Sequence, residues 1–135
     1  MGGGPDGVRL LLDTHVLVWS ATDPERLSKT ATTTLLDPVN RLFVSSATSW
    51  EIATKQRIGK LPQGGELLES FELVLADLRA SLISIGHEHA VLAGSMPGTH
   101  RDPFDRMLAA QAQVEDLHLI TRDPAFSDLG VRVIW

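Results

Sequence analysis

Short apolar runs alternate with longer segments of helical periodicity along this chain. Each run is bounded by polar or turn residues and has the length of a buried strand. Because strands that are covered on both faces read as nearly continuous apolar runs, this pattern favours a parallel sheet. The runs are VRLLLD (8–13), RLFVSS (41–46), SLISIG (81–86) and LHLITRD (117–123), with VRVIW (131–135) as a candidate fifth strand.

The segments between these runs predict helices. Asp23 and Pro24 have the residue types of a helix N-cap and first helical position, so a helix is expected to begin there. Asp102 and Pro103 repeat this pair and predict a helix that ends at Gln113. The other predicted helices cover 46–59, the amphipathic segment 64–80, and 87–94.

Strands separated by helices imply right-handed crossovers and a mainly parallel sheet. The expected fold class is therefore α/β, with three α/β/α layers around a sheet of four to five strands. At 135 residues the chain is the size of one domain. Residues 8–135 are expected to form it, and the glycine-rich residues 1–7 are expected to be a flexible tail.

The composition narrows the functional classes. The chain has no cysteine, which excludes disulfides, thiolate nucleophiles and cysteine-based zinc sites and makes a reducing cytoplasm the expected compartment. No apolar run approaches the ~20 residues of a membrane span, and we expect no signal peptide and no membrane partner. A net charge of −5 is not typical of a generic nucleic-acid binder, which is usually basic.

Acidic side chains follow the predicted strands in four successive units. Asp13 and Asp123 come directly after strands, and Glu51 lies about a turn and a half into the helix after the second strand. Asp102 and Asp105 open the helix that follows the third strand. Each of these acids alone could be a cap or a solvated charge. In parallel sheets, however, functional sites form outside the carboxyl ends of the strands.

Carboxylates gathered at one edge repel one another unless they share protons or bind a cation. The donors are oxygens, with no cysteine and no ordered set of histidines, and they favour Mg²⁺, with Mn²⁺ as a substitute. Such an ion would reverse the negative electrostatic field of the carboxylates, so that the site could hold a phosphate oxygen, and it would lower the pKa of a bound water molecule. Glu51 or Asp123 could then orient this water molecule for attack on the phosphate.

Four strings also resemble, in order and spacing, the motifs of PIN-domain ribonucleases, above all the VapC-type toxins of bacterial toxin–antitoxin pairs. The resemblance spans residues 9–135 and is specific because all four motifs occur in sequence. The strings are LLDTHVLVW (11–19), SSATSWEIATK (45–55), HRDPFDRMLAAQA (100–112) and LITRDPAF (119–126).

The resemblance implies a PIN-like fold and metal-dependent hydrolysis of RNA phosphodiester bonds. It also implies a homodimer and a cognate VapB-like antitoxin that silences the toxin. We expect an arginine or lysine of that partner to enter the acidic site, and the predicted helix around 65–80 to form a wall of its groove. Carried over by position, the catalytic and metal-binding residues would be Asp13, Glu51, Asp105 and Asp123.

Further residues are expected to assist. Asp102 is interpreted as the N-cap, although its carboxylate stands beside that of Asp105. Supporting hydrogen bonds around the metal acids are expected from Thr14, Asp102 and Thr121. The expected contacts to RNA phosphates are Lys55, Arg101, Arg106 and Arg122.

Two alternatives stay open at this point. One is a housekeeping PIN nuclease, and the other is a non-catalytic module that keeps the fold and binds a partner. An aspartyl-phosphate phosphotransfer domain shares the acid after strand one. The dehalogenase-like type would need a second aspartate where His15 stands, and a receiver domain would need adjacent early acids and a late lysine.

Overall fold

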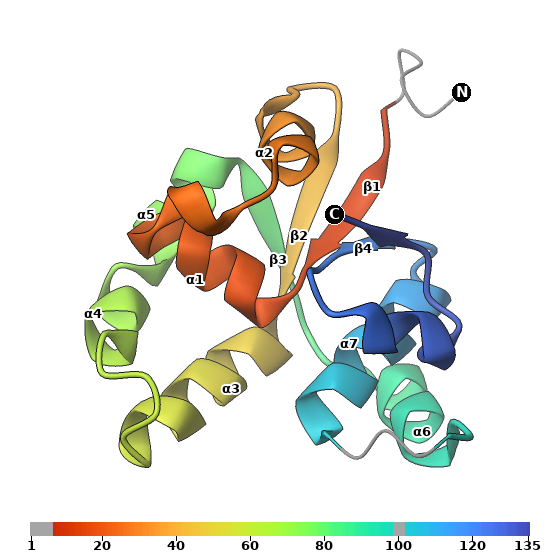
Figure 1. Cartoon of the computed structure of the whole chain (residues 1–135). Coiled ribbons are helices and arrows are strands. Elements are labelled where there is room, and N and C mark those ends of the chain that lie inside the picture. The colour runs from red at the N-terminus through yellow and green to blue at the C-terminus, as the bar shows by residue number, and fades with distance from the viewer. Residues whose placement is uncertain (1–6, 99–101) are drawn as a thin grey trace.

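The computed structural model describes residues 7–98 and 102–135 and contains a five-stranded, all-parallel sheet (Figure 1). The strand order is β3-β2-β1-β4-β5, with β1 at the centre. The predicted fold class is confirmed, and all five predicted strands are present, each trimmed at its ends. The strands are β1 (Arg9–Leu12), β2 (Arg41–Ser45), β3 (Ala80–Ile83), β4 (His118–Ile120) and β5 (Val133–Ile134).

Helices cover both faces of this sheet. They are α1 (Thr14–Thr22), α2 (Lys29–Leu36), α3 (Ser46–Arg57), α4 (Gly64–Glu69), α5 (Phe71–Leu78), α6 (His87–Ser95) and α7 (Pro103–Val114), with two 3-10 helices, η1 (Pro24–Arg26) and η2 (Pro124–Leu129). Among the described residues, no helix is both long and apolar enough to cross a bilayer.

The central strand β1 divides the interior into two cores. Successive side chains of a strand point to opposite faces of the sheet. Leu10 and Leu12 pack with residues of α1 and α2 on one face, whereas Leu11 packs with residues of α6 and α7 on the other. All three leucines are completely buried, and β1 is therefore the strand on which both layers depend.

The structure adds a helix that the sequence did not predict and corrects the start of the next. Helix α1 follows β1 directly and is mostly buried, so its apolar residues form no one-sided stripe by which it could be recognised. The helix expected to begin at Pro24 is a short 3-10 turn. Helix α2 starts after Ser28, whose hydroxyl accepts a hydrogen bond from the Ala31 N–H.

The single helix predicted over 64–80 is two helices that meet at Ser70. The Ser70 hydroxyl donates to the Glu66 carbonyl oxygen at 2.9 Å, a local bond that competes with regular helix geometry. Helix α4 packs closely on α3: a Cβ atom at Gly64 would lie 2.9 Å from the Gln56 Cβ. Helix α5 lies instead beside β3, the strand that follows it in the chain, so the two helices have different neighbours on either side of Ser70.

The carboxyl ends of β1, β2 and β4 lie at the same edge of the sheet, because these strands are parallel neighbours in register. Helices α1 and α3 begin there, directly after β1 and β2. Residues 1–6 of the predicted tail, and Arg101 among the predicted RNA contacts, lie outside the described residues.

We expect Leu11→Ala to lower the free energy of unfolding by about 3 kcal/mol, because it removes methyl groups from the buried centre of the sheet. The matched control is Leu36→Ala, at a side chain that is 74% exposed, with an expected change within about 0.5 kcal/mol. Urea unfolding measures both. Equal losses in the two variants would contradict the placement of β1 at the core.

Candidate active site

Asp13 is fixed at the end of β1 by its backbone and by its side chain. Its N–H donates to the Ile120 carbonyl oxygen at 3.0 Å, which continues the pairing with β4. The carboxylate is buried, and Oδ2 accepts a hydrogen bond from Thr121 Oγ1 at 2.7 Å. Thr121 Oγ1 in turn accepts from the Asp123 N–H at 3.0 Å. This chain of bonds joins the segment after β4 to the acid after β1, as expected for Thr121.

Glu51 is equally buried but has a different partner. The side chain is 3% exposed, and Oε2 lies 2.5 Å from Lys55 Nζ, one turn further along α3. The other oxygen, Oε1, is buried and has no hydrogen-bond partner among the described residues. A buried carboxylate oxygen without a donor is costly, so the position suits a cation.

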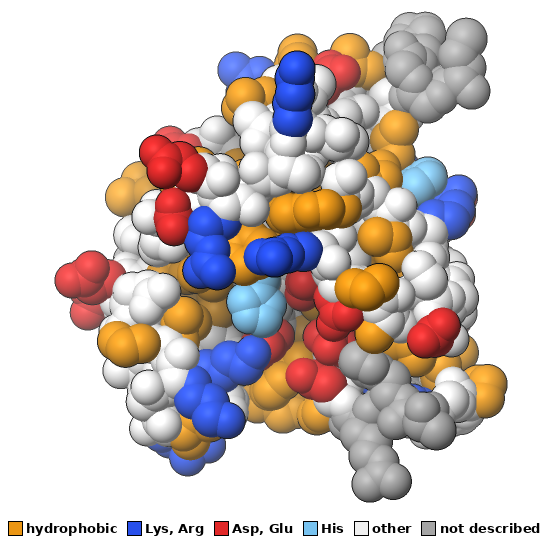
Figure 2. All heavy atoms as spheres, viewed as in Figure 1, with side chains coloured by type: hydrophobic (Ala, Val, Ile, Leu, Met, Phe, Trp, Pro, Cys, Tyr) orange, Lys and Arg blue, Asp and Glu red, His pale blue; other side chains and the backbone are white. Residues whose placement is uncertain are grey.

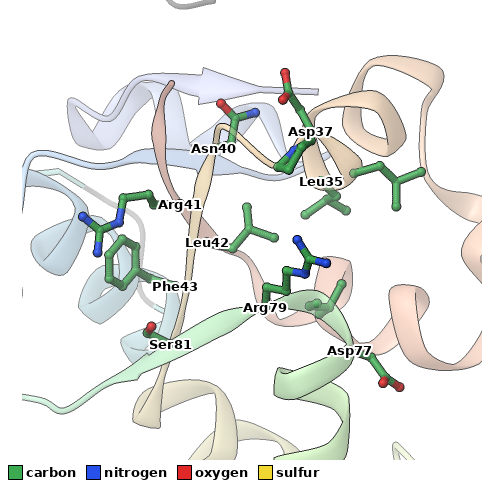
Figure 3. Close-up of a pocket in the computed structure, with 12 residues that line it drawn as sticks. Leu35, Asp37, Asn40, Arg41, Leu42, Phe43, Asp77, Arg79 and Ser81 are labelled. Carbon is green, nitrogen blue, oxygen red and sulfur yellow. The ribbon is translucent and has the colours of Figure 1, made fainter. Parts of the chain in front are cut away.

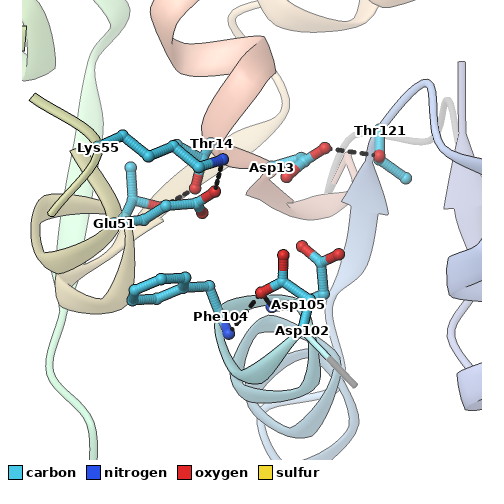
Figure 4. Close-up of polar contacts among 9 residues, drawn as sticks. Asp13, Thr14, Glu51, Lys55, Asp102, Phe104, Asp105 and Thr121 are labelled. Atoms are coloured by element: carbon cyan, nitrogen blue, oxygen red, sulfur yellow. Dashed lines mark hydrogen bonds and ion pairs between the residues drawn. The ribbon is translucent and has the colours of Figure 1, made fainter. Parts of the chain in front are cut away.

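Asp102 and Asp105 open helix α7 with different local roles. Oδ1 of Asp102 accepts hydrogen bonds from the N–H groups of Phe104 at 2.9 Å and Asp105 at 3.2 Å. The predicted N-cap role of Asp102 is therefore confirmed. Figure 4 shows both carboxylates pointing from the start of α7 toward Asp13, with Glu51 approaching from α3.

Asp123 also caps a helix, which was the alternative interpretation of each acid in the sequence analysis. Its Oδ1 accepts from the Ala125 N–H at 2.9 Å and caps η2, with Pro124 in the first position. The arrangement repeats that of Asp102 and Pro103. The Asp123 backbone lies beside Asp13 through Thr121, but its metal-binding role stays a prediction.

A pair of buried threonines connects the helices that carry the first two acids. Thr14 Oγ1 and Thr48 Oγ1 lie 3.2 Å apart, between the start of α1 and α3. Thr14 was expected to assist the site, whereas Thr48 was missed. Its position three residues before Glu51 places it near the same face of α3, a spacing that could have indicated it.

Burial dominates the electrostatics of Asp13. Desolvation raises the pKa of Asp13 above its ordinary value, and the charge of Glu51 raises it further. The Thr121 hydrogen bond, His15 and the Thr14 backbone N–H oppose this rise without cancelling it. Figure 2 shows acidic side chains gathered in a hollow of this face, with basic and histidine side chains on its border.

The predicted RNA contacts do not share one environment. Lys55 lies inside the acidic site, and Arg122 is exposed directly after Thr121. Arg106 instead holds the end of α6: Nε donates to the Ala93 carbonyl oxygen at 2.9 Å, and a second guanidinium nitrogen donates to that of Met96. This clamp between α7 and α6 is a structural role that the sequence did not indicate.

The acids converge without forming a closed ligand shell. Within 7–98 and 102–135, no three histidine, aspartate or glutamate side chains already stand at metal-coordinating spacing. The acidic site is also separate from a pocket of about 540 Å³ at the opposite end of β2 and β3 (Figure 3). That pocket is lined by residues of α2, β2, α5 and β3, such as Leu42 and Arg79, and by none of the predicted site residues.

Comparisons with known proteins agree with this architecture. The family model described as "PIN domain" matches residues 10–131. Ribonuclease VapC22 of Mycobacterium tuberculosis is 28% identical over 116 residues, which cover 84% of this chain and 86% of that protein.

Solved structures share the fold at lower identity. The crystal structure of VapBC2 from Rickettsia felis, bound to a DNA fragment from its promoter, has a TM-score of 0.71 at 16% identity and covers 94% of this chain and 98% of that one. FitAcB from Neisseria gonorrhoeae has a TM-score of 0.63 at 20% identity, with 93% and 96% covered. VapBC-5 from Mycobacterium tuberculosis, described as a toxin–antitoxin member, has a TM-score of 0.61 at 20% identity, with 94% and 98% covered.

We expect Asp13→Asn to stabilise the metal-free protein at neutral pH. Because the folded state raises the pKa of Asp13, its neutral form contributes stability that is fully present below about pH 4 and is lost as pH rises through the folded pKa. Asparagine resembles the neutral acid and does not titrate. The difference in Tm between variant and wild type should therefore be small in acid and grow with pH.

Thermal unfolding in metal-free buffer from about pH 4 to about pH 8 measures this difference. Asp128→Asn, at an exposed position on η2, is the control and should follow the wild-type curve. A constant offset between Asp13→Asn and wild type across this range would contradict the raised pKa.

Proposed function

We propose, since this chain belongs to the PIN domain family, that it is a metal-dependent ribonuclease and the toxin of a toxin–antitoxin pair. The observation that carries the proposal is the meeting of buried Asp13 and Glu51 with Asp105 at the carboxyl edge of a parallel sheet. The names of its relatives support it, because one is a ribonuclease and others are toxin–antitoxin complexes.

The donor set fits a divalent cation. Asp13, Glu51, Asp105 and Asp123 would hold it, and the unpartnered Oε1 of Glu51 is an oxygen that such an ion would satisfy. Carboxylate oxygens favour Mg²⁺ or Mn²⁺ over softer metals. When bound, the ion supplies positive charge for an RNA phosphate and lowers the pKa of a water molecule.

The residues of the chain would position the metal-binding carboxylates and contribute the charges that this reaction needs. Thr121 holds Asp13 at the end of β1, and Asp102 fixes the first turn of α7 from which Asp105 extends. Glu51 or Asp123 would accept a hydrogen bond from the attacking water and orient it toward phosphorus. Because the site is acidic, RNA also needs cationic contacts, for which Lys55 inside the site and the exposed Arg122 are the candidates.

We expect Asp13→Asn and Asp105→Asn each to reduce RNA cleavage by at least about a hundredfold, because each removes one anionic metal ligand. Asp102→Asn is the matched control and should retain most of the activity, since asparagine caps a helix about as well as aspartate. Initial rates on a labelled RNA pool with Mn²⁺ measure these effects, and EDTA should stop the wild-type reaction.

Near-wild-type cleavage by Asp13→Asn or Asp105→Asn would remove that residue from the proposed site. Loss of activity in Asp102→Asn alone would exchange the roles of Asp102 and Asp105. Full activity in EDTA, with no metal retained by the protein, would contradict the metal-dependent mechanism. The absence of any cleavage by the wild type in Mn²⁺ would favour a non-catalytic PIN domain.

Helix α5 supports the proposal of a protein partner. Its sequence FELVLADL is largely apolar, yet among its described residues none is fully buried, and Leu73 is 69% exposed. An amphipathic segment of an antitoxin could cover this face. An arginine of that antitoxin would be the residue best suited to pair with the carboxylates, because its planar fork matches them in bidentate fashion. A housekeeping nuclease would need no such partner.

We expect the small protein encoded beside this gene to bind the chain and suppress both RNA cleavage and growth inhibition. Leu73→Asp should weaken that binding at least tenfold while RNA cleavage persists, because it places a charge on the proposed contact face. Val91→Asp is the control: it is 55% exposed on α6, on the other layer.

Co-expression, growth assays and calorimetry measure these effects. The toxin proposal would be contradicted if the protein encoded beside this gene neither binds the chain nor restores growth, and if expression of the chain alone does not inhibit growth. A housekeeping nuclease would then be favoured.

A further inference from the structure

Lys55 brings a positive charge into the acidic site. Its Nζ lies 2.5 Å from Glu51 Oε2, and the lysine side chain is 29% exposed whereas that of Glu51 is 3% exposed. Figure 4 shows the lysine running along α3, so that its ammonium group reaches the space that the carboxylates face. The pair therefore differs from an ordinary surface i,i+4 pair, which is solvated on both sides.

The ammonium group also interacts with acids on a second helix. Burial by itself would lower the pKa of Lys55, but the hydrogen bond and charge of Glu51 raise it above its ordinary value, and the charges of Asp102 and Asp105 add to this. Lys55 thus places a positive charge between the acids of α3 and those at the start of α7.

We propose that Lys55 is the counter-cation of the metal-free site and competes with the divalent ion for Glu51. This inference rests on the proposed metal site. One Glu51 oxygen is held by the ammonium group while the other is buried without a partner, so Glu51 can accept a second cation only against the charge of the first. Metal binding at Oε1 would therefore be opposed by the ammonium charge on Oε2 and would be favoured when the ammonium group leaves Glu51.

Displacement gives the lysine two opposing effects. In the metal-free protein the ion pair stabilises buried Glu51, and it thereby weakens metal binding. After displacement the ammonium group lies at the border of the site, where it can pair with an RNA phosphate. Loss of the charge should therefore tighten metal binding, destabilise the metal-free fold and slow RNA cleavage. If Lys55 had a purely structural role, loss of its charge would destabilise the metal-free fold without tightening metal binding.

The test is a titration with Mn²⁺ alone, followed by electron paramagnetic resonance, in the absence of RNA. Lys55→Met keeps roughly the length of the side chain and removes its charge. The Kd of this variant for Mn²⁺ should fall by about tenfold, because the metal ion no longer competes with a charge-assisted hydrogen bond between Lys55 and Glu51. Lys55→Arg keeps the charge and should bind Mn²⁺ no more tightly than wild type.

Lys60→Met is the matched control for net charge. It makes the same chemical change at an exposed position near the end of α3, and its Kd should stay within about twofold of wild type if the effect requires contact with Glu51. Thermal unfolding in metal-free buffer should show a lower Tm for Lys55→Met. Cleavage of RNA at saturating Mn²⁺ should fall in Lys55→Met and remain unchanged in Lys60→Met.

Equal or weaker Mn²⁺ binding by Lys55→Met than by wild type would overturn the role of Lys55 and leave the proposed metal site standing. Equal tightening in Lys55→Met and Lys60→Met would also overturn it, because net charge would then explain the effect. If Mn²⁺ binds to none of the variants nor to wild type, the metal site and this inference both fail.

Discussion

The repulsion between carboxylates that the fold buries together is the constraint on which this structure depends. The parallel neighbours β1 and β4 end at one edge of the sheet, and helices α1, α3 and α7 begin beside it. This topology brings Asp13, Glu51 and Asp105 together in spite of the repulsion between their charges. Helix N-termini reduce that cost, since Asp13 and Asp105 lie where the α1 and α7 dipoles are positive. Thr121 and Lys55 reduce it further.

The same constraint explains why so much of the site could be predicted. Strand runs and the helices between them imply a parallel sheet, and a parallel sheet places every residue that follows a strand at one edge. The position of Asp13 follows from this logic, and that of Glu51 follows once α3 is known to begin there. The Asp102 cap was predictable as well, because aspartate is a favoured N-cap residue and proline a favoured first residue of a helix.

What could not be predicted depends on contacts between distant segments. Helix α1 is buried on most sides, so no amphipathic stripe marks it. Arg106 looked like a phosphate ligand because the sequence does not show that the end of α6 lies beside α7. Thr48 gains a role only when α1 packs on α3. The cap at Asp123 is a local feature of its aspartate–proline pair, and only the link of Asp123 to Asp13 through Thr121 depends on a distant segment.

Asp13, Glu51 and Asp123 accept hydrogen bonds from different kinds of donor, and the charge of the donor decides how each acid responds to a cation. A neutral hydroxyl holds Asp13, and a backbone N–H holds Asp123; neither carries a charge that opposes a cation. Glu51 is held by an ammonium group. A neutral donor can keep its hydrogen bond while the acid accepts a cation, but an ammonium group repels that cation. Under the proposed function, Glu51 is therefore the acid at which the lysine and an incoming cation, whether a metal ion or a partner arginine, would compete.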